Sequence, residues 1–180
     1  METSLKVAII GLGNIGRIVA KNLVNGKQPV IIASKKLEDA QILAQQLGNL
    51  ATAKGTIEAI KAADVVILSV WFNTIQEFFK TYANELQGKI IIDPSNPIAP
   101  DENGGFKKII GETESAGQLN AAILPKNAKL AKAFGTLGAA SLENASLGAT
   151  EKSVLFYASD DNTIDNTVEE LILASGFDAL

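Results

Sequence analysis

Short apolar runs alternate with segments of helical periodicity along most of this chain. Four of the runs are uninterrupted, as in strands that are buried on both faces of a parallel sheet. These runs are Val7–Ile10, Val30–Ala33, Val65–Leu68 and Ile90–Ile92. Strands separated by helices predict an α/β fold with a doubly wound, mostly parallel sheet of the Rossmann-like type, because right-handed crossovers place helices on both faces. We expect residues 1–180 to form a single dinucleotide-binding domain.

Between these runs, apolar residues recur at three- and four-residue spacing, which predicts amphipathic helices. The clearest stripe precedes Gly88 and consists of Ile75, Phe78, Phe79, Tyr82 and Leu86. Glycine also follows the other predicted helices, at positions 26, 48 and 176. At Gly26 we expect the left-handed backbone conformation that favours the end of a helix.

The pattern loosens after Asp93. Three prolines between positions 94 and 100 predict a loop of fixed shape without a regular element. Further strands are predicted at Leu130–Phe134 and Val154–Ala158, and a last helix around Ile164–Ile172. Ligands of such sheets bind at the carboxyl ends of the strands, where the strand order reverses. The loops that follow the strands are therefore the place to look for function.

Composition excludes several classes of function. The chain has no cysteine and no histidine, which removes thiolate metal sites, cysteine nucleophiles and Ser-His-Asp triads. A net charge of -4 and a pI near 4.9 argue against nucleic-acid binding and polybasic membrane contact. No apolar run approaches the roughly 20 residues that span a bilayer, and residues 1–6 lack the features of a signal peptide. We expect a cytoplasmic protein with a small-molecule partner.

The strongest motif follows the first apolar run directly. It matches the dinucleotide fingerprint G-x-G-x-x-G and reads Gly11-Leu12-Gly13-Asn14-Ile15-Gly16. In this motif Gly11 permits a tight turn, Gly13 lets the backbone approach a pyrophosphate, and Gly16 lets helix and strand pack closely. Free backbone N–H groups at the start of the following helix attract the anion. The alternative is a glycine turn that only links a strand to a helix.

The choice of cofactor is made at the end of the second strand, where an acidic residue would bind the ribose 2′-hydroxyl of NAD. Ser34, Lys35 and Lys36 stand there instead. A hydroxyl and two ammonium groups suit a 2′-phosphate, and no carboxylate repels it. The segment therefore predicts NADP(H). The alternative is that the two lysines are a solvated pair at the start of a helix.

Two further loops are expected at the carboxyl edge of the sheet. Ser69, Val70 and Trp71 follow the third run, and their backbone is expected to line the ribose and nicotinamide. Trp71, the only tryptophan, either covers the reactive ring or belongs to the core. Asn96 and Pro97 follow the fourth run and are expected beside the nicotinamide, unless this segment is only a rigid turn.

No acid-base pair stands out in the sequence. The acidic residues near predicted loops are scattered, and capping or solvation is the role expected for Asp93, Glu112, Glu114, Asp160 and Asp161. Hydride transfer between two cofactor-like rings can proceed by apposition, with the protein supplying orientation and electrostatics. We therefore assign no catalytic residue and expect no metal.

With these motifs, the chain resembles the family of NADP oxidoreductases that depend on the deazaflavin coenzyme F420. The likeness rests on the glycine motif, on Ser34-Lys35, on Ile91-Ile92-Asp93-Pro94-Ser95-Asn96-Pro97 and on Lys132-Ala133-Phe134-Gly135-Thr136-Leu137-Gly138. It implies a Rossmann fold, NADPH as one partner, and a second partner docked over the nicotinamide near Asn96. Two departures are notable. Lys35 stands where the family usually has arginine, and Gly135 replaces the asparagine of the family's K-A-F-N-T segment.

Three functions agree with this sequence. The first is hydride transfer between NADPH and a flavin-like or deazaflavin electron acceptor. Whether such a protein forms a homodimer stays open at this point. The second is a module that senses NADP(H) without turnover. The third is the nucleotide domain of a larger dehydrogenase, since relatives of this family are expected to continue beyond the position of Leu180.

Overall fold

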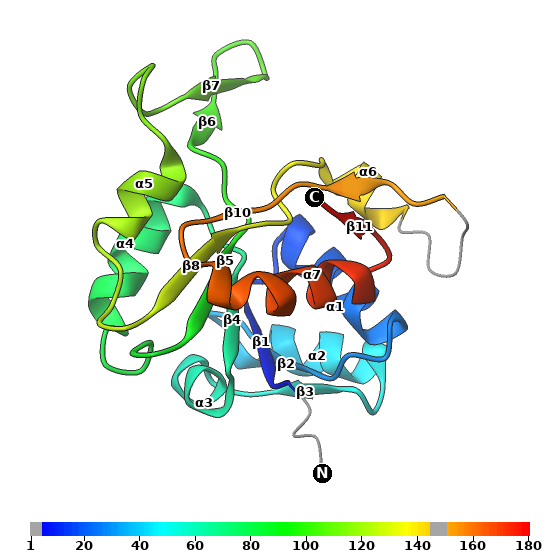
Figure 1. Ribbon diagram of the computed structural model, residues 1–180. Helices are drawn as coiled ribbons and strands as arrows, with labels where there is room; N and C mark the ends of the chain where they lie inside the picture. Colours follow the sequence, from blue (N-terminus) through cyan, green and yellow to red (C-terminus); the bar gives the residue numbers. More distant parts are fainter. Residues whose placement is uncertain (1–4, 145–150) are drawn as a thin grey trace.

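A seven-stranded sheet lies at the centre of the computed structural model, which describes residues 5–144 and 151–180 (Figure 1). Its strands follow the order β10-β8-β5-β4-β1-β2-β3. They are β1 (Val7–Ile10), β2 (Val30–Ala33), β3 (Ala51–Ala53), β4 (Val65–Leu68), β5 (Ile90–Asp93), β8 (Lys129–Lys132) and β10 (Ala158–Ser159). All neighbours are parallel except β10, which pairs antiparallel with β8 at one edge. The predicted doubly wound α/β fold is confirmed.

The strand order reverses between β1 and β4. From β1, the chain proceeds to β2 and β3 on one side and, after returning, to β4, β5 and β8 on the other. The loops that leave the carboxyl ends of β1 and β4 therefore lead to α1 and α4 on opposite faces of the sheet, and in folds of this kind ligands bind in the crevice outside the sheet at this position. The glycine motif and the segment from Ser69 to Trp71 are these two loops.

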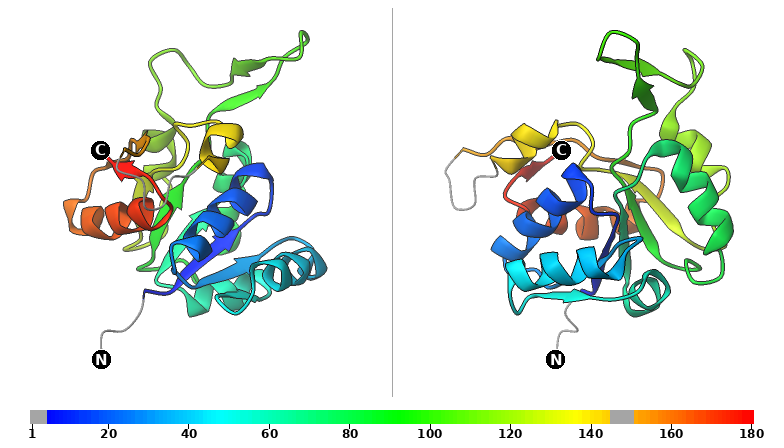
Figure 2. Two further views of the ribbon diagram at one scale, coloured as in Figure 1. Left: turned by 90° about the vertical axis from the view of Figure 1, so that its right-hand side faces the viewer. Right: turned by 180° about the vertical axis from the view of Figure 1, so that it is seen from behind.

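Helices cover both faces of the sheet (Figure 2). One face packs against α1 (Asn14–Asn25), α2 (Leu37–Leu47), α6 (Ala139–Glu143) and α7 (Asp165–Ala174). The other face packs against α3 (Thr56–Ala62), α4 (Phe72–Thr81) and α5 (Ala116–Ala121). Along β1, Val7 and Ile9 belong to the first core, whereas Ala8 and Ile10 belong to the second. Burial on both faces explains why this strand has no polar position.

Gly26 does not adopt the left-handed conformation that we predicted for the end of α1. Its φ is −78°, and Lys27 has the positive φ of 68° instead. Glycine is needed at this position for space, because a Cβ there would lie 1.7 Å from the Ala174 carbonyl oxygen at the end of α7. The prediction was wrong because it considered the helix alone, whereas the contact between two helices determines this residue.

The segment after Asp93 contains a regular element that the prolines led us to exclude. Strands β6 (Ile98–Pro100) and β7 (Phe106–Lys108) form an antiparallel hairpin that extends away from the main sheet (Figure 1). A two-stranded hairpin has only edge strands, and prolines are tolerated there because their missing N–H group can face solvent. Asp101 shapes the turn, since its Oδ1 accepts hydrogen bonds from the backbone N–H groups of Asn103 and Gly105.

The predicted strand from Val154 to Ala158 is two short strands in different sheets. Strand β9 (Val154–Leu155) pairs with β11 (Asp178–Ala179), and β10 joins the main sheet. A 3₁₀ turn at Asn162–Ile164 leads into α7. Strand β3 and helices α3, α5 and α6 were not predicted, because they are short and carry few large apolar residues. In the described part of the chain, no helix has the length and apolar character needed to cross a membrane.

Candidate functional site

The turn after β1 is held tightly by the surrounding backbone. The Gly11 N–H donates to the Ala33 carbonyl at the end of β2, at 3.0 Å, and Gly11 has a φ of 95°. A Cβ on Gly11 would lie 2.3 Å from the Ser69 carbonyl oxygen, and one on Gly16 would lie 2.0 Å from the Gly11 carbonyl oxygen. Only glycine fits at these two positions, as the motif predicts for a tight turn and a close helix.

Gly13 differs from the other two glycines of the motif. A Cβ on this residue would meet no atom within 4 Å, and its φ of −70° is open to any residue. Gly13 is exposed and forms the N-cap of α1, where no side chain accepts a hydrogen bond from the first N–H groups and no acidic residue occupies the first turn. The start of α1 therefore has donors and open space for an anion that approaches along the backbone. Leu12, Asn14 and Ile15 complete this segment.

Arg17 lies beside the glycine turn and was missed by the sequence prediction. It is the only arginine in the chain, it is exposed, and its Nε donates to the Leu12 carbonyl oxygen at 2.9 Å. The bond places a guanidinium group next to the start of α1. Its position immediately after the motif was the signal that could have identified it, because a cation there adds to the attraction of the helix start for phosphate.

Ser34, Lys35 and Lys36 follow β2 directly, at the same edge of the sheet as the glycine turn. Ser34 is half-buried, and both lysines are exposed. The ion pairs among the described residues involve neither lysine, so both ammonium groups are available to a ligand. Lys36 is the N-cap of α2, whose first turn also contains Glu38.

Ser69, Val70 and Trp71 form the loop between β4 and α4. The Ser69 N–H donates to the Ile10 carbonyl at 2.8 Å, which ties this loop to the end of β1. Ser69 and Val70 are half-buried, whereas the Trp71 side chain is 60% exposed. The alternative in which Trp71 belongs to the core is therefore wrong. Its indole is therefore accessible to a ligand.

Asn96 and Pro97 lie in the loop after β5. The exposed Asn96 donates from Nδ2 to the Gly135 carbonyl at 3.0 Å, and this bond joins the loop to the segment that follows β8. The two segments approach closely, since a Cβ on Gly135 would lie 2.5 Å from the Pro94 carbonyl oxygen. The Pro97 carbonyl accepts from the Ile109 N–H at 2.9 Å and so connects the loop to the base of the hairpin.

Asp93 is fully buried, so of the two expected roles, capping and solvation, only capping applies to it. Its Oδ1 accepts from the Ser95 N–H at 2.7 Å, which is a capping role, and its Oδ2 accepts from Asn120 Nδ2 at 2.8 Å. The same Oδ2 lies 2.9 Å from Lys132 Nζ, and Lys132 also donates to the Ser95 carbonyl. The sequence prediction missed this ion pair: Asp93 follows the predicted run Ile90–Ile92, whereas Lys132 lies inside the predicted strand Leu130–Phe134 and ends the observed strand β8.

The other acidic residues of that group are exposed or partly exposed, and two of them, Glu114 and Asp161, have local structural roles. Asp161 caps the 3₁₀ turn by accepting from the Thr163 N–H at 2.9 Å, and its hydrogen bonds to Thr163 and Lys129 lower its pKa. Glu114 accepts from the Gly111 N–H at 2.6 Å. Among the described residues, no cluster of acidic side chains could hold a metal ion. Capping is confirmed for Asp161.

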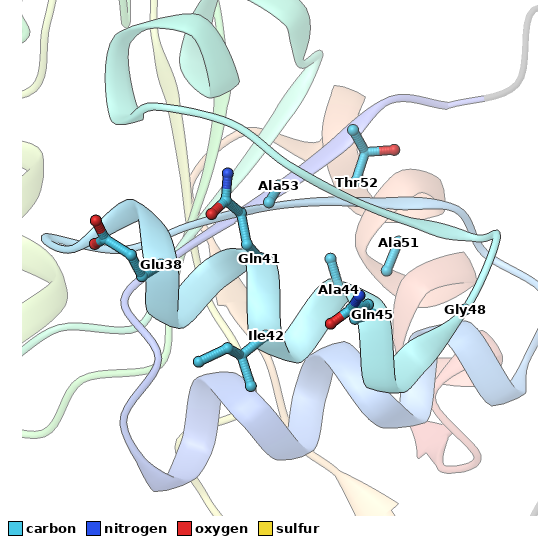
Figure 3. Close-up of a pocket in the computed structure, with 9 residues that line it drawn as sticks. All are labelled: Glu38, Gln41, Ile42, Ala44, Gln45, Gly48, Ala51, Thr52 and Ala53. Atoms are coloured by element: carbon cyan, nitrogen blue, oxygen red, sulfur yellow. The ribbon is translucent and has the colours of Figure 1, made fainter.

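A groove of about 760 Å³ lies between α2 and β3 (Figure 3). Its walls come from α2 between Glu38 and Gln45 and from β3, and none of the predicted site residues lines it. A second groove of about 390 Å³ runs between α5, β8 and β10 and includes Lys132. The predicted site lies instead at the carboxyl edge of the sheet, along the loops that follow β1, β2, β4 and β5.

A family profile described as "NADP oxidoreductase coenzyme F420-dependent" matches residues 6–97, just over half of the chain. The matched region extends from β1 to the loop after β5 and so contains every residue predicted for the cofactor site.

Curated relatives match only part of the chain. Glutamyl-tRNA reductases from two strains of Methanococcus maripaludis are 33% and 36% identical over 102 and 104 residues. Each alignment covers 56% of this chain but only 26% or 27% of the relative. The chain thus spans about a quarter of the length of these enzymes.

Solved structures match over nearly the whole chain. A hypothetical protein from Sinorhizobium meliloti is 28% identical with a TM-score of 0.85, covering 98% of this chain and 83% of that one. A proposed F420-dependent NADP reductase from Arthrobacter sp. FB24 is 20% identical with a TM-score of 0.81, covering 97% and 83%. A reductive aminase from Aspergillus terreus in complex with NADPH is 19% identical with a TM-score of 0.68, covering 99% and 54%. The last two likenesses show the fold.

Proposed function

Because the chain belongs to the family of coenzyme F420-dependent NADP oxidoreductases, we propose that it transfers hydride between NADP(H) and a flavin-like or deazaflavin acceptor. NADP as the cofactor agrees with the prediction from the sequence. The observation that carries the proposal is the uncapped start of α1 at the reversal of strand order, with open space at Gly13. We treat residues 1–180 as a single dinucleotide-binding domain.

The residues present fit the diphosphate of the cofactor. The backbone from Gly11 to Gly16 would hold it, with the N–H groups at the start of α1 as donors and Gly13 as the point of closest approach. Leu12, Asn14 and Ile15 contribute backbone rather than side-chain chemistry. We assign to Arg17 a supporting electrostatic role, because its guanidinium lies against the Leu12 carbonyl.

The ribose 2′-phosphate would lie at Ser34, Lys35 and Lys36. Two ammonium groups that form no ion pair with the described residues favour a dianion by charge, and the Ser34 hydroxyl can donate a hydrogen bond. A lysine binds phosphate as a point charge, without the two-pronged hydrogen bonding of arginine. Selection for NADP(H) over NAD(H) therefore depends on charge more than on geometry.

The nicotinamide end would lie between the loop from Ser69 to Trp71 and the loop with Asn96 and Pro97. Bound there, the nicotinamide supplies the hydride chemistry. The chain contributes orientation, since its loops are fixed to neighbouring strands by the Ser69 and Asn96 hydrogen bonds. The exposed Trp71 indole offers a flat apolar surface for a ring-shaped acceptor and excludes water from one side of it.

Two other functions make different predictions. A sensing module would bind NADP(H) as tightly but reduce no acceptor. The nucleotide domain of a larger dehydrogenase would do the same until joined to a substrate domain, and the partial match to glutamyl-tRNA reductases favours this alternative over the first. Neither explains an exposed Trp71 beside the crevice as directly as a ring-shaped acceptor does.

The proposal is tested by calorimetric titration with NADPH and NADH, followed by stopped-flow mixing with a panel of flavins and deazaflavins. The Lys35→Glu variant should weaken NADPH binding about tenfold or more and leave NADH binding nearly unchanged, because a carboxylate would face the 2′-phosphate. Lys126→Glu is the matched control, since Lys126 is exposed in a turn that precedes β8 at the opposite edge of the sheet. Equal losses of affinity for NADPH and NADH would contradict the assignment of Ser34, Lys35 and Lys36 to the 2′-phosphate. If no acceptor were reduced above background, the proposed hydride transfer would be contradicted.

A further inference from the structure

A polar cluster lies at the ends of β5 and β8, and it consists of Asp93, Ser95, Asn120 and Lys132. We propose that Lys132 is a positioning residue, which holds the loop with Asn96 and Pro97 in the shape that lines the nicotinamide. It acts through Asp93 and the Ser95 carbonyl rather than by contact with the cofactor. This inference rests on the proposed function, and it adds a residue that orients the reacting end of the cofactor.

The strand register brings the two charges together. Asp93 and Lys132 are paired residues on the adjacent parallel strands β5 and β8, so their side chains leave the sheet on the same face. Asp93 is fully buried, and the Lys132 side chain is only 24% exposed. A separation of 2.9 Å between Lys132 Nζ and Asp93 Oδ2 makes this a direct ion pair at the carboxyl edge of the sheet. The ammonium group also reaches the Ser95 carbonyl and thus binds the loop itself.

A second attachment lies on the same two segments. Asn96 donates to the Gly135 carbonyl, and the backbone of Gly135 lies so close to Pro94 that a Cβ would not fit. The preceding residue, Phe134, is fully buried and has a positive φ of 62°, which is strained for a bulky side chain. Backbone strain of this kind persists only where the surrounding contacts hold the residue in place, and strained residues are concentrated at functional sites. Strand β8 and the segment that follows it therefore hold the loop after β5 at two neighbouring residues, Ser95 and Asn96.

Stability alone does not explain the cluster. A buried ion pair is often no more stabilising than apolar residues of the same volume. Two buried polar atoms beside it, Ser95 Oγ and Asn120 Oδ1, have no hydrogen-bond partner among the described residues. An unpartnered polar atom in a protein interior is destabilising, because it loses its hydrogen bonds to water without replacement. A cluster with such costs is expected where it fixes one particular loop geometry, and the loop it fixes carries Asn96.

The experiment separates the two ends of the cofactor. The probes are NADPH and adenosine 2′,5′-bisphosphate, which lacks the nicotinamide, and binding is measured by calorimetry. The variants are Lys132→Met and the double variant Asp93→Asn with Lys132→Met. The double variant leaves no unpaired charge in the interior, so it is the one expected to fold if Lys132→Met alone does not. Lys132→Arg keeps the charge and should retain much of the wild-type behaviour.

A positioning role predicts that both Met-containing variants bind adenosine 2′,5′-bisphosphate within about twofold of wild type, while NADPH binding weakens about five- to tenfold, as for the loss of one hydrogen bond. For an acceptor that the wild type reduces, hydride transfer should slow about a hundredfold, the effect of a misplacement near 1 Å. Parallel loss of both probes, or unchanged NADPH binding and transfer, overturns the proposal. A wild type that binds NADPH and reduces no acceptor refutes only the proposed function, because the binding comparison still decides the role of Lys132.

Discussion

The two ends of the proposed cofactor site are built in different ways. At the end that would bind the diphosphate, glycines and backbone hydrogen bonds shape the loops after β1 and β4. No side chain at the N-cap of α1 accepts a hydrogen bond from the first N–H groups of the helix. At the nicotinamide end, the loops after β5 and β8 are shaped by side chains, namely Asp93, Lys132, Asn120 and Asn96. A diphosphate is common to all dinucleotides, whereas the geometry around the nicotinamide determines which acceptor fits. We infer that the first end captures the cofactor and the second sets specificity.

The largest effect is expected within the glycine motif, where the fold needs the space at Gly16 and the ligand needs the space at Gly13. In Gly16→Ala the new Cβ would lie 2.0 Å from the Gly11 carbonyl oxygen, so the backbone must move. We expect a loss of about 3 kcal/mol or more in the free energy of unfolding, measured in urea, and no detectable NADPH binding.

Gly13→Ala is the matched control, because its Cβ would meet no protein atom within 4 Å. Its free energy of unfolding should stay within about 1 kcal/mol of wild type, while NADPH affinity should fall at least about tenfold, since the methyl group occupies the path of the diphosphate. A Gly13→Ala protein that binds NADPH normally would contradict the assignment of this turn.

The next effect tests the nicotinamide end. Gly135→Asn introduces the asparagine of the family's K-A-F-N-T segment, but a Cβ at this position would lie 2.5 Å from the Pro94 carbonyl oxygen. We expect a destabilisation of about 1–3 kcal/mol and slower hydride transfer, with adenosine 2′,5′-bisphosphate bound as by wild type.

Gly138→Asn provides the control for that change. Gly138 is the N-cap of α6, its Cβ position is open, and asparagine is favoured at helix N-caps. Stability and transfer should both remain near wild type. If Gly135→Asn also left stability and hydride transfer near wild type, the close contact between Gly135 and Pro94 would have no effect on function.

The smallest effect on stability is expected for Trp71→Ala. Because the side chain is 60% exposed, the free energy of unfolding should change by no more than about 0.5 kcal/mol. Stopped-flow transfer to a flavin or deazaflavin should nevertheless slow about tenfold, the value of one aromatic stacking contact. Phe106→Ala removes another exposed aromatic, on β7, and should change neither quantity. A variant at Trp71 with wild-type transfer would exclude the indole from the acceptor surface.

The first half of the site could be predicted from the sequence because its information is local. Uninterrupted apolar runs gave β1, β2 and β4, and the glycine spacing between β1 and α1 is a feature of neighbouring residues. The short strand β3 has only alanine and threonine, so its three residues carry no recognisable pattern. The hairpin was missed for the opposite reason, since its prolines are a strong local signal against a strand.

The second half could not be predicted because it depends on register. Asp93 ends β5 and Lys132 ends β8, and nothing in either segment shows that the two residues face each other until the strands are paired. Gly26 presents the same difficulty, because its requirement for space comes from Ala174 on another helix. Polar contacts between distant segments are the part of a site that local patterns do not contain.

The most direct test of the central claim is a crystal structure of the protein with NADPH bound. The account predicts the diphosphate within hydrogen-bonding distance of the backbone N–H groups at the start of α1, over Gly13, with the 2′-phosphate at Ser34 and Lys35. A diphosphate located elsewhere, or a crevice between the β1 and β4 loops that is closed by side chains, would contradict it.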